Sequence, residues 1–224
     1  MAEEEKKTAS SKVSAFLEKN RKCVIATLIV LIAALVVYIV VDVCSGKASE
    51  KGLAAVDEIT YALTVDATKI EADEIETRKA TAIEALAPLA KKGGVTGVRA
   101  NLVLADLAYQ DKNYEDALNY WKAAAAKGKK SYTAPIAYYN IASCYEALDN
   151  IDEAVAYYKK AADSKDFVLK AHAKFSYGRA LEAKGDFVNA VAVYNELQTI
   201  NPDDTWAKLA KTRLIKLKIE GKAE

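Results

Sequence analysis

The sequence predicts an all-α protein in which a single N-terminal transmembrane helix precedes an α-solenoid of helix-turn-helix repeats and a C-terminal capping helix. Strong helix formers dominate the 224 residues, which include only 9 Gly and 3 Pro. One long apolar run lies near the N-terminus, and three later segments resemble one another. The net charge is only +1, which is too small a positive charge to attract nucleic acid.

The N-terminal part is predicted to be a polar tail, residues 1–22, followed by a transmembrane signal anchor, residues 23–44. Residues 23–41 carry no charge, and as an α-helix they span about 28 Å, close to the hydrocarbon thickness of a bilayer. A buried soluble helix would have a polar stripe, and a cleaved signal peptide would have a shorter apolar region that ends in small residues. No polar stripe interrupts this run, which disfavours the buried helix. The run is also longer than a signal-peptide core, and Asp42–Val43–Cys44 after it is not a small-residue site, so an uncleaved anchor is favoured.

The charges that flank this segment predict its orientation. Six Lys and Arg residues precede it, whereas only Lys47 and Lys51 follow closely. The positive-inside rule therefore places the tail in the cytoplasm and residues 45–224 on the exported side, which opposes an organelle import receptor with cytosolic repeats. Lipidation at Cys44 is a less favoured alternative, because Val43 is branched where a lipobox needs a small residue.

Three segments, residues 101–124, 138–161 and 174–197, repeat a helix-turn-helix pattern. The corresponding alanines Ala117, Ala154 and Ala190 are 37 and 36 residues apart. Small residues recur where the two helices of each pair are expected to cross, because a larger side chain would push them apart. These small pairs are Ala105 with Ala117, Ala142 with Ala154, and Gly178 with Ala190.

This pattern resembles the tetratricopeptide repeat, whose first helix carries large–x2–Leu–small–x2–Tyr and whose second helix carries Ala–x3–aromatic. The second segment is nearly consensus, with Ile141–Ala142 and Tyr145 followed by Ala154 and Tyr158. The first segment departs from it, because Ala108 replaces the first tyrosine. The resemblance implies three repeats over residues 98–202.

Helices are also predicted at both ends of the array. Residues 203–224 follow Pro202 as a capping helix, with Trp206 in its apolar stripe and Arg213 among its solvating residues. Residues 45–97 are predicted to form a degenerate N-terminal helical pair that ends near Gly93–Gly94. Whether residues 49–92 form a true repeat stays open at this point.

The resemblance implies a concave surface, lined by the first helices, that contacts an extended peptide or a partner helix. The twelve positions that it assigns to this groove are Arg99, Leu102, Asp106, Tyr109, Ile136, Tyr139, Ser143, Glu146, His172, Phe175, Arg179 and Glu182. Their mixture of aromatic, aliphatic and charged side chains suits adaptable protein recognition. A carboxylate-clamp site is disfavoured, because Leu102 and Asp106 stand where that version of the fold has Lys and Asn.

The sequence predicts no enzyme, no metal site and no cofactor. Cys23, Cys44 and Cys144 are scattered and His172 stands alone, whereas a structural zinc site needs about four ligands at set spacings. His172 has no Ser or Cys in a recognisable catalytic frame. These patterns favour an interaction protein.

The overall architecture resembles the YfgM-like family, which are ancillary subunits of the bacterial SecYEG translocon. That resemblance implies an inner-membrane protein whose periplasmic repeats bind the translocon or periplasmic chaperones. The alternative is a cell-envelope or outer-membrane assembly lipoprotein that is lipidated at Cys44.

Overall fold

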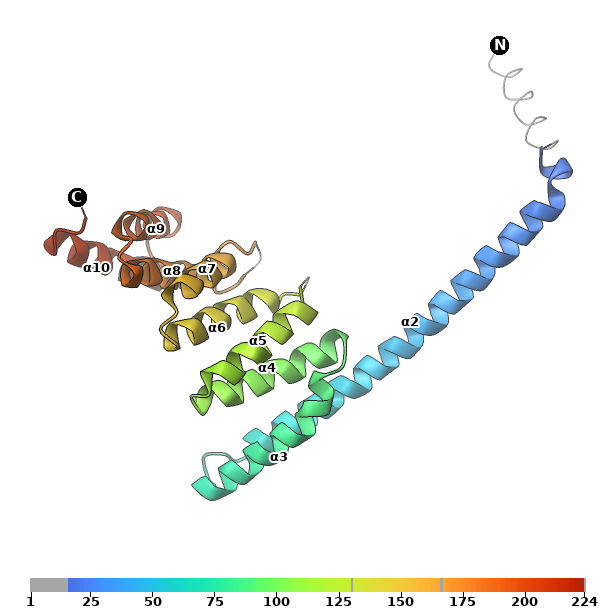
Figure 1. Ribbon diagram of the computed structural model, residues 1–224, viewed down its shortest axis with the longest axis horizontal. Helices are drawn as coiled ribbons and strands as arrows, with labels where there is room; N and C mark the ends of the chain where they lie inside the picture. Colours follow the sequence, from blue (N-terminus) through green and yellow to red (C-terminus); the bar gives the residue numbers. More distant parts are fainter. Residues whose placement is uncertain (1–15, 130, 166, 224) are drawn as a thin grey trace, which may run out of the picture. The chain divides into compact units, whose positions relative to one another are not determined.

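The computed structural model describes residues 16–129, 131–165 and 167–223, and every regular element among them is a helix (Figure 1). This confirms the predicted all-α class. The chain divides into two compact units, Met1–Glu50 and Lys51–Glu224. Most of the predicted cytoplasmic tail, residues 1–15, lies outside the described residues.

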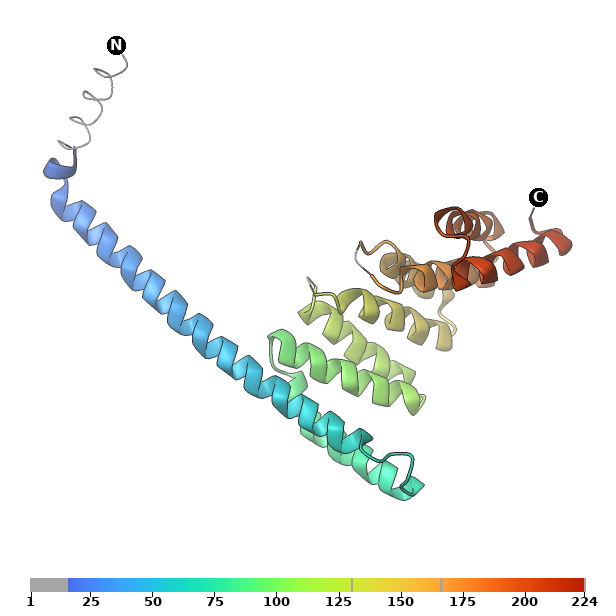
Figure 2. The same cartoon turned by 180° about the vertical axis from the view of Figure 1, so that it is seen from behind.

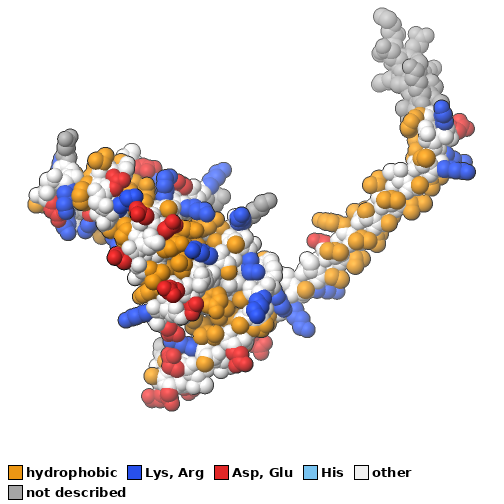
Figure 3. All heavy atoms as spheres, in the orientation of Figure 1, with side chains coloured by type: hydrophobic (Ala, Val, Ile, Leu, Met, Phe, Trp, Pro, Cys, Tyr) orange, Lys and Arg blue, Asp and Glu red, His pale blue; other side chains and the backbone are white. Residues whose placement is uncertain are grey.

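Helix α2, Arg21–Thr64, contains the predicted span and continues past it without a break. Figure 3 shows its apolar side chains along the surface, and Ile29 and Val37 are each 61% exposed. The Thr27 hydroxyl donates to the carbonyl of Cys23 at 2.9 Å, so this polar group is satisfied within the helix. Within the described residues, α2 is the helix that is long and apolar enough to cross a membrane.

The unit Lys51–Glu224 is a row of antiparallel helices, each packed against the next from α3 onward (Figure 2). Val56, near the end of α2, packs against Leu86 and Leu104. The helices that follow α2 are α3 (Ala72–Ala90), α4 (Gly94–Gln110), α5 (Tyr114–Lys127), α6 (Ala134–Ala147), α7 (Ile151–Ala162), α8 (Lys170–Lys184), α9 (Phe187–Ile200) and α10 (Thr205–Ile219). The last of these, α10, packs against both α8 and α9.

The three helix pairs α4–α5, α6–α7 and α8–α9 share one turn. In each, a residue with positive φ ends the first helix region, and an Asn or Asp side chain then accepts the backbone N–H three residues later, as an N-cap does. The positive-φ residues are Lys112, Asp149 and Gly185, and the caps are Asn113, Asn150 and Asp186. The same local chemistry therefore forms the turn in all three pairs.

Small residues lie where the paired helices cross, so the two backbones approach closely and larger side chains pack around the crossing. Ala105, Ala117, Ala142, Ala154 and Ala190 are all completely buried. Gly178 is also buried, and a Cβ atom there would lie 2.5 Å from a ring carbon of Tyr194. This close packing holds the first helices at fixed positions along one surface.

Candidate functional site

The candidate site is the surface of the first helices α4, α6 and α8. None of the twelve predicted groove residues is fully buried. Asp106 and Tyr109 on α4 are exposed, and the other ten are half-buried. All twelve side chains therefore reach solvent, as a binding surface requires.

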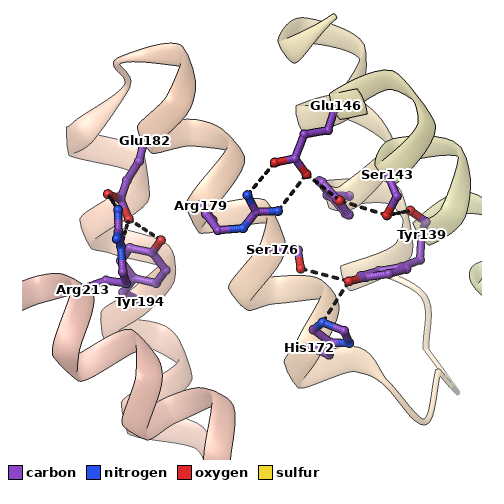
Figure 4. Close-up of polar contacts among 10 residues, drawn as sticks. Tyr139, Ser143, Glu146, His172, Ser176, Arg179, Glu182, Tyr194 and Arg213 are labelled. Atoms are coloured by element: carbon purple, nitrogen blue, oxygen red, sulfur yellow. Dashed lines mark hydrogen bonds and ion pairs between the residues drawn. The ribbon is translucent and has the colours of Figure 1, made fainter. Parts of the chain in front are cut away.

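Tyr139 links α6 to α8 at the centre of this surface (Figure 4). Its hydroxyl lies 2.8 Å from Nε2 of His172 and 3.2 Å from Oγ of Ser176. Its ring also packs on that of His172, with 4.8 Å between centroids. Burial is the larger cause of a raised Tyr139 pKa, so this hydroxyl stays protonated at neutral pH.

Glu146 forms a three-residue contact that we call a clasp. It accepts a hydrogen bond from the Tyr158 hydroxyl at 2.9 Å. It also accepts a bidentate pair of hydrogen bonds from the Arg179 guanidinium (Figure 4). Desolvation alone would raise the pKa of Glu146, but the hydrogen bonds from Arg179 and Tyr158 outweigh it and lower the pKa. The clasp joins the second helix of its own pair to the first helix of the next.

Glu182 forms a second clasp 36 residues later. It accepts from the hydroxyl of Tyr194 at 2.5 Å and from Nε of Arg213 at 2.9 Å, and a second Arg213 nitrogen completes the pair (Figure 4). Its side chain is only 9% exposed, and the Arg213 and Tyr194 contacts lower its pKa against the opposing effect of desolvation. Arg213 is therefore not a purely solvating residue, which corrects the sequence-based expectation.

Helix α10 also contributes an aromatic side chain that the sequence analysis did not assign to the groove. Trp206 stacks on His172 with centroids 3.8 Å apart and planes 11° apart, and it lies 5.5 Å from the ring of Phe175. Desolvation and the charge of Arg179 lower the pKa of His172, so the stacked imidazole is neutral at neutral pH. Trp206 and Arg213 follow His172 and Arg179 by 34 residues, and that spacing could have identified both.

The α4 end of the surface is organised differently. Arg99 pairs with Asp57 at 2.6 Å, and Leu102 packs against the core below. The ring of Tyr109 meets that of Tyr114 edge-on at 5.2 Å. Among the described residues, Asp106 has no ion pair or hydrogen bond of its side chain, although the groove wall desolvates its carboxyl and raises its pKa.

In the described part of the chain, no group of three or more His, Cys, Asp or Glu residues could hold a metal ion. Cys144 is completely buried, and burial raises the pKa of its thiol to about 12. The thiol is therefore protonated at neutral pH and packs as a small core residue. The chemistry of the site is that of a surface with paired charges and aromatic rings.

Two known proteins are similar to this chain. The chain is 32% identical over 139 residues to a TPR repeat-containing protein of Treponema pallidum (strain Nichols), a match that covers 62% of this chain and 58% of that protein. It also resembles a crystal structure described as "Podosopora anserina putative kinesin light chain nearly identical TPR-like repeats", with a TM-score of 0.47 and 14% identity over 68% of this chain and 88% of the other.

A sequence model of the tetratricopeptide repeat matches residues 77–132, 102–168 and 161–205. Together these ranges span more than half of the chain and contain the whole of helices α4 to α9. The chain therefore belongs to the tetratricopeptide repeat family.

Proposed function

We propose that this protein is a membrane-anchored scaffold that binds polypeptide segments in the groove formed by α4, α6, α8 and α10. The observation that carries the proposal is the row of partly exposed aromatic and charged side chains on these helices, held in place by the two clasps. A preorganised surface of this kind loses little side-chain entropy when a partner binds. Tyrosine and arginine are also the residues most often enriched at binding hot spots.

The proposed anchor is the apolar part of α2, which includes residues 23–44. The excess of Lys and Arg before it supports a cytoplasmic N-terminus and repeats on the exported side. In a bacterial cell the repeats would then lie in the periplasm. Anchoring raises the effective concentration of the groove near other membrane proteins, so weak contacts with the partner suffice.

The partners that we propose are components of the SecYEG translocon or periplasmic chaperones. The test is photo-crosslinking in native membranes from an amber-encoded benzophenone at Tyr139, with Val188 as the control because it is 82% exposed on α9. We expect position 139 to capture translocon subunits or periplasmic folding factors that position 188 does not. Equal capture from both positions contradicts groove binding.

The same membranes test the anchor and the alternative lipoprotein at Cys44. We expect the full chain to resist extraction with alkaline carbonate and its repeats to become protease-sensitive only when the outer membrane is opened. We also expect the intact mass of the purified protein to retain residues 1–43. A mature N-terminus at a lipidated Cys44, with capture of outer-membrane assembly components alone, would establish the lipoprotein alternative instead.

A further inference from the structure

We infer that the α4 end of the groove binds a basic side chain, Lys or Arg, of the partner polypeptide, with Asp106 as its counter-ion. The inference rests on the proposed function, since it names the chemistry that the same groove selects. It is carried by three observations on the first repeat: a carboxylate with no partner among the described residues, the loss of a clasp, and an exposed aromatic ring beside them.

The first observation concerns the pairing of the groove charges. Two ion pairs within the chain neutralise four of these charges: Glu146 pairs with Arg179, and Glu182 pairs with Arg213. Arg99, on the same face of α4, pairs with Asp57. Asp106 is the one charged residue of the predicted groove on α4, α6 and α8 whose side chain has no partner among the described residues. His172 is not counted, because it is neutral.

The second observation concerns the register of the repeats. A clasp needs a Glu on the first helix, a Tyr on the second and an Arg on the next first helix. The first repeat has Tyr109, Trp121 and Ser143 at these three positions. Trp121 is only 3% exposed, and its Nε1–H has no hydrogen-bond partner among the described residues. The first repeat is therefore not closed by the internal contacts that close the other two.

The register also explains why no cation in the described part of the chain reaches Asp106. Arg179 and Arg213 occupy the same repeat position as Asp106, and each of them turns toward the Glu of the preceding repeat. Ser143 occupies it on α6 and is uncharged. Lys122, a cation on the adjacent helix α5, donates instead to the Tyr145 hydroxyl at 2.7 Å. The negative charge at Asp106 thus stays available to a partner.

The third observation is the surface around this carboxylate. The groove wall desolvates Asp106 and raises its pKa, although the residue remains exposed enough for a ligand to reach it. A carboxylate that has lost hydration without gaining a counter-ion is stabilised by an incoming cation. Tyr109, one turn along α4, is 39% exposed and is held edge-on by Tyr114. Its ring and Leu102 offer apolar contact to the methylene stem of a Lys or Arg.

The test uses four pools of capped, fluorescein-labelled nonapeptides whose central residue is Lys, Arg, norleucine or Glu and whose other positions are random uncharged residues. Binding to the full chain in mild non-ionic detergent is measured by fluorescence polarisation. We expect the Lys and Arg pools to bind about tenfold more tightly than the norleucine pool, as one partly desolvated ion pair provides. The Glu pool is expected to bind most weakly.

Asp106→Asn should abolish the preference for basic pools, and Asp106→Glu should retain it. The matched control is Asp203→Asn, which makes the same charge change at an exposed position outside α4. If Lys and norleucine pools bind equally, or if Asp106→Asn keeps the preference, the inference is wrong while groove binding stands. If no pool binds, the proposed function fails together with it.

Discussion

Replacing Gly178 with Ala tests the packing that holds the first helix of the third repeat against the second. A Cβ atom at this position would lie 2.5, 2.9 and 3.0 Å from three ring carbons of Tyr194. Carbon atoms that pack without strain stay about 3.5 Å or more apart. Tyr194 is completely buried and its hydroxyl is bonded to Glu182, so the ring has no free direction in which to move.

Two effects of opposite sign decide the magnitude. Alanine favours a helix over glycine by about 1 kcal/mol. Overpacking costs about 1–3 kcal/mol, and a displaced Tyr194 also loses a hydrogen bond to a charged acceptor, worth about 1.5–3 kcal/mol. We therefore expect Gly178→Ala to lower the free energy of unfolding by about 1.5–5 kcal/mol, despite its better helix propensity.

The assay is urea unfolding of the full chain in mild detergent, followed by the fluorescence of Trp121 and Trp206. With a slope of about 2 kcal/mol per molar urea, the midpoint should fall by about 0.8–2.5 M. Gly46→Ala is the control, because nothing lies within 4 Å of a Cβ atom there. Gly46 lies inside α2, so alanine there gains only the helix-propensity term, and its midpoint should not fall below that of the unmodified chain.

A double-mutant cycle identifies the cause of the loss. In a Tyr194→Leu background the ring that the new methyl group meets is absent, so Gly178→Ala should no longer destabilise the chain. The helix-propensity term alone should then raise the free energy of unfolding by up to about 1 kcal/mol. The same loss in both backgrounds would refute the contact with Tyr194 as the cause.

Three further predictions concern groups that are buried or half-buried. The pKa values of Glu146 and Glu182 lie below the ordinary value of about 4.5. The stability that the clasps contribute is therefore present above pH 4.5 and is lost as the pH falls through the lower, folded-state pKa values. The urea midpoints at pH 7 and about pH 3.5 should differ less in the variant with both Glu residues changed to Gln than in the unmodified chain. Cys144, whose pKa is about 12, should resist iodoacetamide at pH 8 until urea unfolds the chain, as peptide mass spectrometry can check. Asn101→Ala should lower the free energy of unfolding by about 1–3 kcal/mol, measured by thermal melting, because its buried amide donates to the carbonyl of Ala90 at 2.9 Å.

The repeat fold could be predicted from the sequence because its determinants are local and periodic. Small residues such as Ala142 and Ala154 recur where helices cross, and both are completely buried. Asp149–Asn150 also marks the turn between α6 and α7, with Asn150 as the cap. Each of these signals acts over a few residues, so a single sequence is enough to recognise it.

The groove was harder to predict, because its contacts join residues more than 30 positions apart. The apolar stripe on the last helix predicts a capping helix that packs on the end of the array. Trp206 belongs to that stripe, so the sequence alone indicates only a core position for it. Only the packing of α10 on α8 brings its ring onto His172. Likewise, the sequence presents Arg179 and Glu146 as two exposed charges, whereas their bidentate pairing depends on how successive pairs stack.

The uneven placement of the clasps has a mechanical consequence. Each clasp ties one repeat to its successor, and both lie in the part of the array from α6 to α10. Bending that part requires the rupture of an Arg–Glu pair, whereas bending between α4 and α6 stretches no such tie. Elastic compliance is therefore concentrated at the boundary between α4 and α6. There the groove can widen or narrow to fit partner segments of different width, while the part from α6 to α10 keeps its curvature.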